Sequence, residues 1–195
     1  MGNTGTVSET MRRFSAMLCH MRLNKVLPYI SGRVLDVGCL NGEIIPLLGD
    51  GAVEYVGVDI NRGAIEAMKV RYPEHEFFCL DVQEEAVPGG EPFETLVVLA
   101  TIEHLEDPDA FLERYVPLMG PRALIVITTP SPWGERMHRM LQKVHVTRKS
   151  IKELHHTIFP LRGLEQLMTR HGLDVIRARR FELGMNQLIV ARKPL

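Results

Sequence analysis

Residues 34–43, with the sequence VLDVGCLNGE, decide the fold. The run begins as a short apolar strand, stops at Gly38, and leads into residues 43–48, which the apolar pattern predicts to be a helix despite Pro46. Glycine lets a backbone approach a ligand closely, and a helix N-terminus offers free N–H groups. The spacing of Gly38 and Gly42 differs from the dinucleotide motif G-x-G-x-x-G. A ligand site is therefore expected at this turn, and the glycine spacing counts against a nicotinamide dehydrogenase, which is the weaker alternative.

The alternation of apolar strands and helices continues along the chain. Helices are predicted from Asn61 to Arg71, from Asp107 to Met119 and from Leu161 to His171. Strands are predicted over residues 33–38, 54–60, 76–82, 93–100, 123–129, 174–182 and 185–193. Apolar strands that alternate with helices indicate a parallel sheet covered on both faces. The last two strands are separated only by Leu183 and Gly184, so they must form an antiparallel hairpin.

Length and composition predict one globular α/β domain over residues 1–195. The chain is 45% hydrophobic and 24% charged, which is typical of a compact protein. An amphipathic leading helix is expected over residues 8–30, with Arg22 among its polar positions. Residues 131–157 contain the apolar positions of a short helix and fit two roles. One is a lid or substrate-binding segment above the strand ends, and the other is a helix that only closes the core.

The net charge and the cysteine content limit which binding partners and which redox environment the sequence predicts. The formal net charge of -1 predicts no attraction to nucleic acid or to an anionic membrane. The run Arg177, Arg179 and Arg180 is interpreted as the solvated face of a strand. No apolar stretch reaches membrane-spanning length. Three widely spaced cysteines predict free thiols in a reducing cytoplasm rather than a disulfide framework or a zinc site.

Acidic residues stand at three successive strand ends. Asp36 lies in the first strand, Asp59 ends the second about 20 residues beyond the glycine turn, and Asp81 ends the third. Asp59 is placed to accept hydrogen bonds from ribose hydroxyls. Asp81 could accept from an adenine amino group while Ile60 and Val82 hold the ring. Three acids at one sheet edge favour a shared site over three unrelated loop residues.

These motifs together resemble a class I S-adenosylmethionine-dependent methyltransferase of the broad small-molecule group. The resemblance is carried by LDVGC at 35–39, VDI at 58–60, LDV at 80–82, IEHLEDP at 102–108 and the final hairpin. It implies a Rossmann-like, mostly parallel sheet of seven strands and S-adenosyl-L-methionine as the cofactor. Gly38, Asp59 and Asp81 would contact its methionine, ribose and adenine parts. The full set of expected cofactor-binding residues is Asp36, Gly38, Cys39, Gly42, Asp59, Ile60, Asp81, Val82 and Ala100.

The chain departs from the family at two places. Leu40 stands where the family usually has glycine or another small residue, and Glu94 replaces a common aspartate. Leu40 could narrow the turn and weaken cofactor binding. Asn41 works in the other direction, because asparagine tolerates left-handed backbone angles better than most residues.

The candidate catalytic residues are His104, His155 and His156. The pair Glu103-His104 follows the fourth strand, where acceptor and methyl donor would meet, and imidazole can take a proton near neutral pH. The alternative is that His104 only holds its loop and that the adjacent histidines are solvated. One branch of the family binds a metal with this pair and a further acid, but Ala100 occupies the position of that acid, so no metal is expected. His138 and His145 are further histidines that could supply ligands.

The function predicted from these residues is methyl transfer to a small-molecule acceptor. The alternatives are a methyltransferase that acts on RNA or protein, and a non-catalytic protein that binds S-adenosylmethionine. The acceptor and the oligomeric state stay open.

Overall fold

The structure, a computed structural model, describes residues 17, 19–49, 53–88, 90–143 and 156–195. The strands are β1 (Gly32–Val37), β2 (Val53–Asp59), β3 (Glu76–Cys79), β4 (Phe93–Leu99), β5 (Met119–Pro130), β6 (Asp174–Phe181) and β7 (Asn186–Arg192). The helices are α2 (Arg62–Arg71), α3 (Pro108–Tyr115), α4 (Pro132–Lys143) and α5 (Leu161–Arg170). Short 3-10 helices are η1 (Leu27–Tyr29), η2 (Ile45–Leu47), η3 (Ile102–His104) and η4 (Val116–Leu118). The described part of the leading helix is residues 17 and 19–26.

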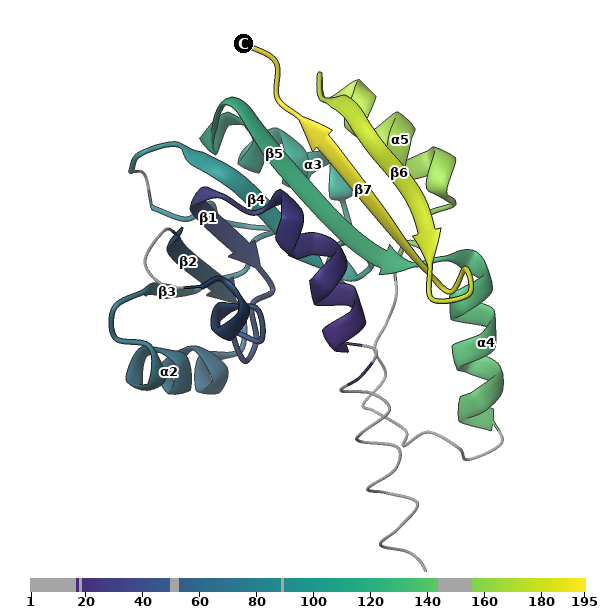
Figure 1. The fold of residues 1–195 in the computed structure, drawn as a ribbon, viewed down its shortest axis with the longest axis horizontal. Coiled ribbons are helices and arrows are strands. Elements are labelled where there is room, and N and C mark those ends of the chain that lie inside the picture. The colour runs from purple at the N-terminus through teal and green to yellow at the C-terminus, as the bar shows by residue number, and fades with distance from the viewer. Residues whose placement is uncertain (1–16, 18, 50–52, 89, 144–155) are drawn as a thin grey trace, which may run out of the picture.

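The seven strands form one sheet in the order β3-β2-β1-β4-β5-β7-β6 (Figure 1). Strands β1 to β5 pair in parallel, whereas β7 pairs antiparallel with both β5 and β6. The predicted mixed sheet with its C-terminal hairpin is confirmed. Because β1 and β4 are neighbours although β2 and β3 lie between them in sequence, the chain reverses direction across the sheet at this pair. Ligands of such sheets bind beyond the carboxyl ends of the strands at this point.

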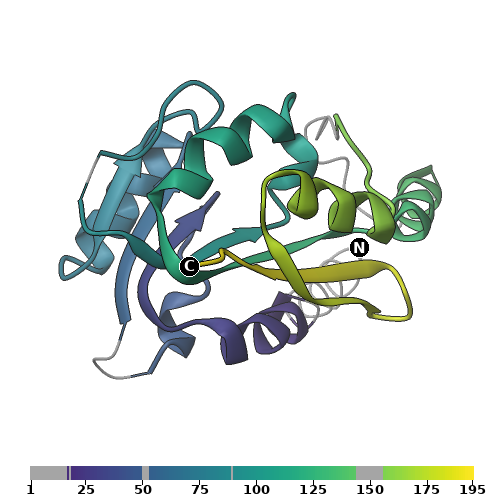
Figure 2. The same cartoon turned by 90° about the horizontal axis from the view of Figure 1, so that it is seen from above.

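Helices cover both faces of the sheet (Figure 2). Side chains of α3 and α5, among them Phe111 and Leu164, pack in one core cluster with Leu35 of β1. The leading helix and α2 pack in the other cluster through Leu23 and Ile65. The central strands are therefore buried on both sides, which explains why their sequences are apolar throughout.

Local sequence signals fix the helix ends. The Asn61 side chain accepts a hydrogen bond from Ala64 N at 3.1 Å and begins α2, as predicted. Asp107 likewise accepts from Ala110 N at 3.0 Å and begins α3. Gly172, with φ of +70°, ends α5. Each cap satisfies backbone groups that the helix leaves unpaired.

Four expectations need correction. Residues 43–48 form a turn and the single 3-10 turn η2 instead of a helix, because Pro46 lacks an N–H group. Strand β3 ends at Cys79, three residues early. Strand β5 begins at Met119, four residues early, and has a register irregularity in its pairing with β4. In β6 a register shift between Val175 and Arg177 breaks the expected alternation.

The segment 131–157 is described only in part, because residues 144–155 lie outside the described residues. Helix α4 occupies its first half and stands beside the β6–β7 turn (Figure 1). Ser131 Oγ donates to the carbonyl oxygen of Gly184 at 2.6 Å and accepts from Gly134 N at 3.0 Å. Trp133 is 51% exposed. No described helix is both long and apolar enough to cross a bilayer.

Candidate functional site

A cavity of about 230 Å³ lies at the carboxyl ends of β1 and β4. Its wall combines three segments that are far apart in sequence: the turn after β1, the end of β4 and the leading helix. The lining includes Cys19, Arg22, Asp36, Gly38, Cys39, Leu40, Asn41, Glu43, Ala100 and Thr101. Four of the nine expected cofactor-binding residues, Asp36, Gly38, Cys39 and Ala100, thus line one cavity.

The turn after β1 requires glycine at Gly38. Its φ is +76°, and a Cβ atom there would lie 2.3 Å from Thr101 Oγ1. Thr101 is itself tied down, because its hydroxyl donates to the carbonyl oxygen of Val37 at 3.1 Å. The N–H groups of Gly38 and Cys39 both donate to Val58 O, at 2.8 and 3.1 Å. The end of β1 is therefore fixed to β2 and β4 before any ligand is present.

The left-handed backbone position in this turn falls on Leu40, not on Asn41. Leu40 has φ of 40°, and Asn41 is not among the residues with positive φ. Gly42 N donates to Cys39 O at 2.8 Å and closes a four-residue turn around the two. A positive φ at the second residue of a turn is a conformation that favours glycine. The left-handed conformation costs a leucine about 1 to 2 kcal/mol, so the expected help from Asn41 is wrong.

Asp59, at the end of β2, holds the turn from the neighbouring strand. Its Oδ2 accepts from Leu40 N at 3.0 Å and its Oδ1 accepts from Asn61 N at 2.8 Å. Each carboxylate oxygen keeps further acceptor capacity. Asp59 is therefore oriented by backbone donors, and its position at the strand end is the one expected for binding a diol.

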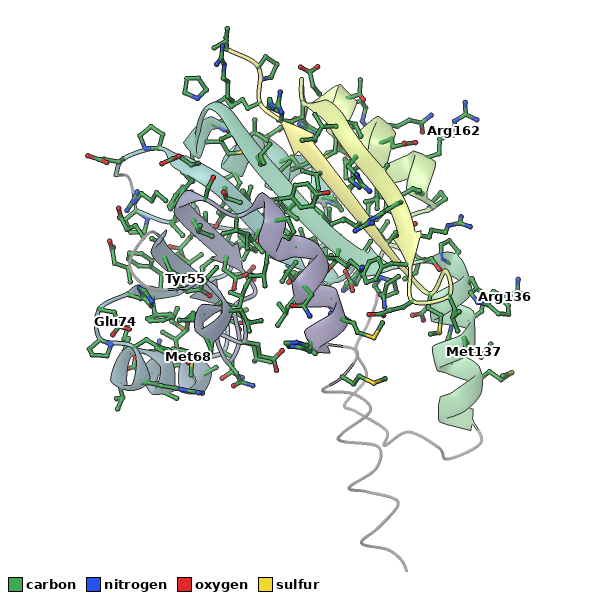
Figure 3. The ribbon with its side chains drawn as sticks, in the orientation of Figure 1. Tyr55, Met68, Glu74, Arg136, Met137 and Arg162 are labelled. Atoms are coloured by element: carbon green, nitrogen blue, oxygen red, sulfur yellow. The ribbon has the colours of Figure 1, made fainter. Side chains whose placement is uncertain are left out.

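Asp36 is a buried carboxyl group in the cavity wall and is 5% exposed. The hydroxyl of Tyr55 donates to its Oδ2 at 2.7 Å. Tyr55 lies on the α2 side of the sheet with Met68 (Figure 3). Burial raises the pKa of Asp36 to about 6, while the Tyr55 hydrogen bond lowers the pKa and the nearby charge of Asp59 raises it. Burial thus favours the protonated form of Asp36, and the ionised form would attract a cationic ligand group.

The three residues expected to bind adenine differ in their exposure and follow β2 and β3. Ile60 is 69% exposed and follows Asp59 directly. Asp81 is two residues beyond β3, and its Oδ1 accepts from Gln83 N at 2.9 Å. Val82 is buried in the core cluster. Of the two apolar residues expected to hold a ring, Ile60 is the one with an open face.

The Glu103-His104 pair is in η3, just after β4. Glu103 is 1% exposed, and its carboxylate accepts from Thr129 Oγ1 at 2.8 Å. Its backbone oxygen accepts from His156 N at 2.8 Å and Thr157 N at 3.2 Å. His104 is half-buried and the His156 side chain is exposed. The backbone of His156 therefore lies beside η3, which contains His104, while His155 lies outside the described residues.

A metal site is not visible in the described part of the chain. No group of three His, Cys, Asp or Glu residues there could hold an ion. The His138 side chain and His145 lie outside the part of the chain that the structure describes.

Two cavity residues from the leading helix, Arg22 and Cys19, were not among the sequence-based candidates. The Nε atom of Arg22 is buried and has no hydrogen-bond partner. Cys19 Sγ donates to Glu43 Oε2 at 2.6 Å, and burial together with this hydrogen bond raises the pKa of Cys19 to about 11. The amphipathic pattern of the helix predicts that Arg22 is polar-facing. It does not show that this face meets a cavity.

Comparisons with known proteins show the family to which the chain belongs. Residues 11–178 match the family model described as "Methyltransferase domain". A ubiquinone biosynthesis O-methyltransferase of Bradyrhizobium diazoefficiens is 29% identical over 101 residues, which are 50% of this chain and 39% of that protein. The chain spans between 39 and 64% of the length of this and three other curated relatives.

Solved structures share the fold. A SAM-dependent methyltransferase of Archaeoglobus fulgidus has a TM-score of 0.68 at 20% identity and covers 91% of this chain and 94% of its own. The [4+2]-cyclase SpnF has a TM-score of 0.70 at 12% identity and covers 90% of this chain and 80% of its own. The family and the fold imply S-adenosylmethionine as the cofactor. The chain belongs to the methyltransferase domain family, within the class I S-adenosylmethionine-dependent methyltransferases.

Proposed function

We propose that the protein transfers a methyl group from S-adenosylmethionine to a small-molecule acceptor. The observation that carries this proposal is the cavity at the carboxyl ends of β1 and β4, with Arg22 and Asp36 in its wall and Asp59 beside it. The methionine part of the cofactor has a carboxylate, an ammonium group and a sulfonium centre. A guanidinium and a buried carboxylate are matching partners for these charges.

The residues present fit the cofactor. Arg22, whose Nε is buried without a partner, would bind the carboxylate of the methionine part. Asp36 would face its cationic groups, and Asp59 would accept hydrogen bonds from the ribose hydroxyls. The backbone of Gly38, Cys39 and Gly42 would lie against the methionine part. Asp81 would bind the adenine amino group, with Ile60 against the ring.

When bound, the cofactor supplies an electrophilic methyl group. The protein's own share is mostly to hold the acceptor in line with that group, because proximity and orientation can supply up to about 7 to 11 kcal/mol of a barrier. An acceptor hydroxyl or amine must also lose a proton. His104 in η3 and His156 in the segment before α5 are the candidate bases for this proton. Glu103 connects their two segments through its backbone oxygen.

A small acceptor is supported by the name of the Bradyrhizobium relative, a ubiquinone biosynthesis O-methyltransferase, and by the net charge of -1, which gives no general attraction to RNA. The same charge argues for no association with an anionic membrane. Helix α4, which begins directly after β5, is proposed to contribute to the acceptor side of the site. In Figure 3 Arg136 and Met137 mark this helix, far from Tyr55 and Met68.

Leu40 supports a second candidate, a protein that binds S-adenosylmethionine without methyl transfer. Leu40 lines the cavity in which the cofactor would bind. Folds of this kind can also host functions other than methyl transfer.

One experiment separates the two functions. The purified chain is incubated with methyl-labelled S-adenosylmethionine and a metabolite extract, and products are separated by chromatography. Label in a small molecule supports the proposal. Binding of the donor with label found in no product, small or macromolecular, supports the second candidate, and label in protein or RNA alone contradicts a small acceptor.

A further inference from the structure

Leu40 stands between two parts of the proposed cofactor site. Its side chain lines the cavity together with Arg22 and Asp36. Its backbone N–H donates to Oδ2 of Asp59 at 3.0 Å, and Asp59 does not belong to the lining of the cavity. Leu40 therefore lies beside both parts of the site that a ligand of Arg22 and Asp59 would contact.

Packing does not explain a leucine at this position. The residue is 47% exposed, so it gains only part of the stabilisation that a buried leucine provides. It also has φ of 40°, a conformation that favours glycine. Strained residues that the core does not need are concentrated at functional sites. The side chain is therefore best explained by what it does to a ligand.

We propose that the Leu40 side chain is an apolar partition that weakens the binding of ligands spanning the cavity and the Asp59 edge. Such a ligand must push the side chain aside, and the four side-chain carbons keep it from the backbone of the turn. The same effect applies to the donor and to its demethylated product, S-adenosylhomocysteine. Leu40 thereby speeds product release at the cost of affinity. This inference rests on the proposed function.

The test compares S-adenosylhomocysteine, which would contact both the cavity and Asp59, with adenosine, which would contact only the Asp59 side. Affinities for S-adenosylhomocysteine and for adenosine are measured by calorimetry on the full chain and on the variants Leu40→Ala and Leu40→Gly. Both variants are expected to bind S-adenosylhomocysteine about tenfold more tightly, a difference of about 1.4 kcal/mol. Adenosine affinity is expected to stay within twofold, because adenosine need not cross the partition.

Leu183 offers a matched control. It is also a leucine with positive φ, 56°, and it is 95% exposed in the β6–β7 turn, outside the cavity lining. Leu183→Gly and Leu40→Gly are both expected to raise the melting temperature by about 2 to 4 °C, because both relieve the same backbone strain. Only the Leu40 variants should change ligand affinity.

Three results would overturn the partition. The first is that both Leu40 variants bind S-adenosylhomocysteine with the affinity of the wild-type protein. The second is that Leu40→Gly binds it more tightly but Leu40→Ala does not. The third is that Leu183→Gly binds it more tightly by the same factor as the Leu40 variants. Each of these leaves the proposed function intact, because the wild-type protein still binds. If neither the wild-type protein nor any variant binds donor or product, the proposed function fails and the partition with it.

Discussion

The Tyr55 hydroxyl donates a 2.7 Å hydrogen bond to Asp36 inside the protein, and the carboxylate that accepts it forms part of the cavity wall. Burial nevertheless raises the pKa of Asp36 from 3.8 to about 6. The folded protein therefore binds this proton more tightly than the unfolded chain does. Two predictions follow from this one carboxyl group.

Asp36 should make folding stability depend on pH. The contribution of its protonated form is fully present below pH 3.8 and is lost as the pH rises through about 6. The pKa difference corresponds to about 3 kcal/mol. Asp36→Asn should therefore raise the free energy of unfolding at pH 7.5 by about 1 to 3 kcal/mol, with little change at pH 4. Urea denaturation at both pH values measures this, and identical differences at the two would refute the burial argument.

The affinity for the cofactor should rise with pH, whereas the contribution of Asp36 to folding stability falls. An ionised Asp36 attracts the cationic methionine part, so S-adenosylmethionine should bind more tightly as the pH rises through about 6. Tyr55→Phe removes a hydrogen bond that lowers the pKa, so the midpoint should move to higher pH. Calorimetry between pH 5 and 8 follows the transition. The same midpoint in Asp36→Asn would assign it to another group.

Arg22 should recognise the carboxylate of the methionine part. Arg22→Ala is expected to weaken binding of S-adenosylmethionine by about 10- to 100-fold, as hydrogen bonds to charged groups contribute about 1.5 to 3 kcal/mol. Binding of adenosine, which has no carboxylate, should be unaffected. Arg22→Lys keeps the positive charge but loses the planar guanidinium group. Its affinity for S-adenosylmethionine should therefore lie between that of the wild-type protein and that of Arg22→Ala. Equal losses for both ligands would indicate a distorted helix instead.

The roles of His104 and His156 can be distinguished by measuring kcat of their variants with an identified acceptor. If His104 or His156 is the base, its substitution by glutamine should lower kcat by about 10²- to 10⁴-fold and remove the acidic limb of the pH profile. The affinity for S-adenosylmethionine should not change. A normal pH profile in both variants would exclude both histidines and leave His155 as the remaining candidate from the sequence.

Much of the fold could be predicted because its strongest signals are local. Strands β1 and β4 contain runs of consecutive apolar residues, which is typical of strands that are covered on both faces. Asn61 and Asp107 are residue types that commonly cap helices, and both do so here. The apolar spacing of residues 43–48 predicts a helix, but Pro46 lacks an N–H group and the segment forms only the 3-10 turn η2.

The site was predictable in part for the same reason. Asp36, Asp59 and Asp81 are at or near strand ends, and the strand order alone brings such ends together. Two features depend on tertiary contacts and could not be predicted. The Asp59 carboxylate fixes the N–H of Leu40, which helps to place the left-handed residue there instead of at Asn41. The cavity faces Arg22 only because of how the leading helix packs.

The most direct test of the proposed function is calorimetric titration of the full chain with S-adenosylmethionine, alongside Asp59→Ala and Asp59→Asn. The wild-type protein is predicted to bind in the micromolar range. Asp59→Ala should show no measurable heat while keeping its far-ultraviolet circular dichroism, and Asp59→Asn should bind weakly, because an amide oxygen can still accept one hydrogen bond. No heat from the wild-type protein, or undiminished binding by Asp59→Ala, would contradict the proposed cofactor site.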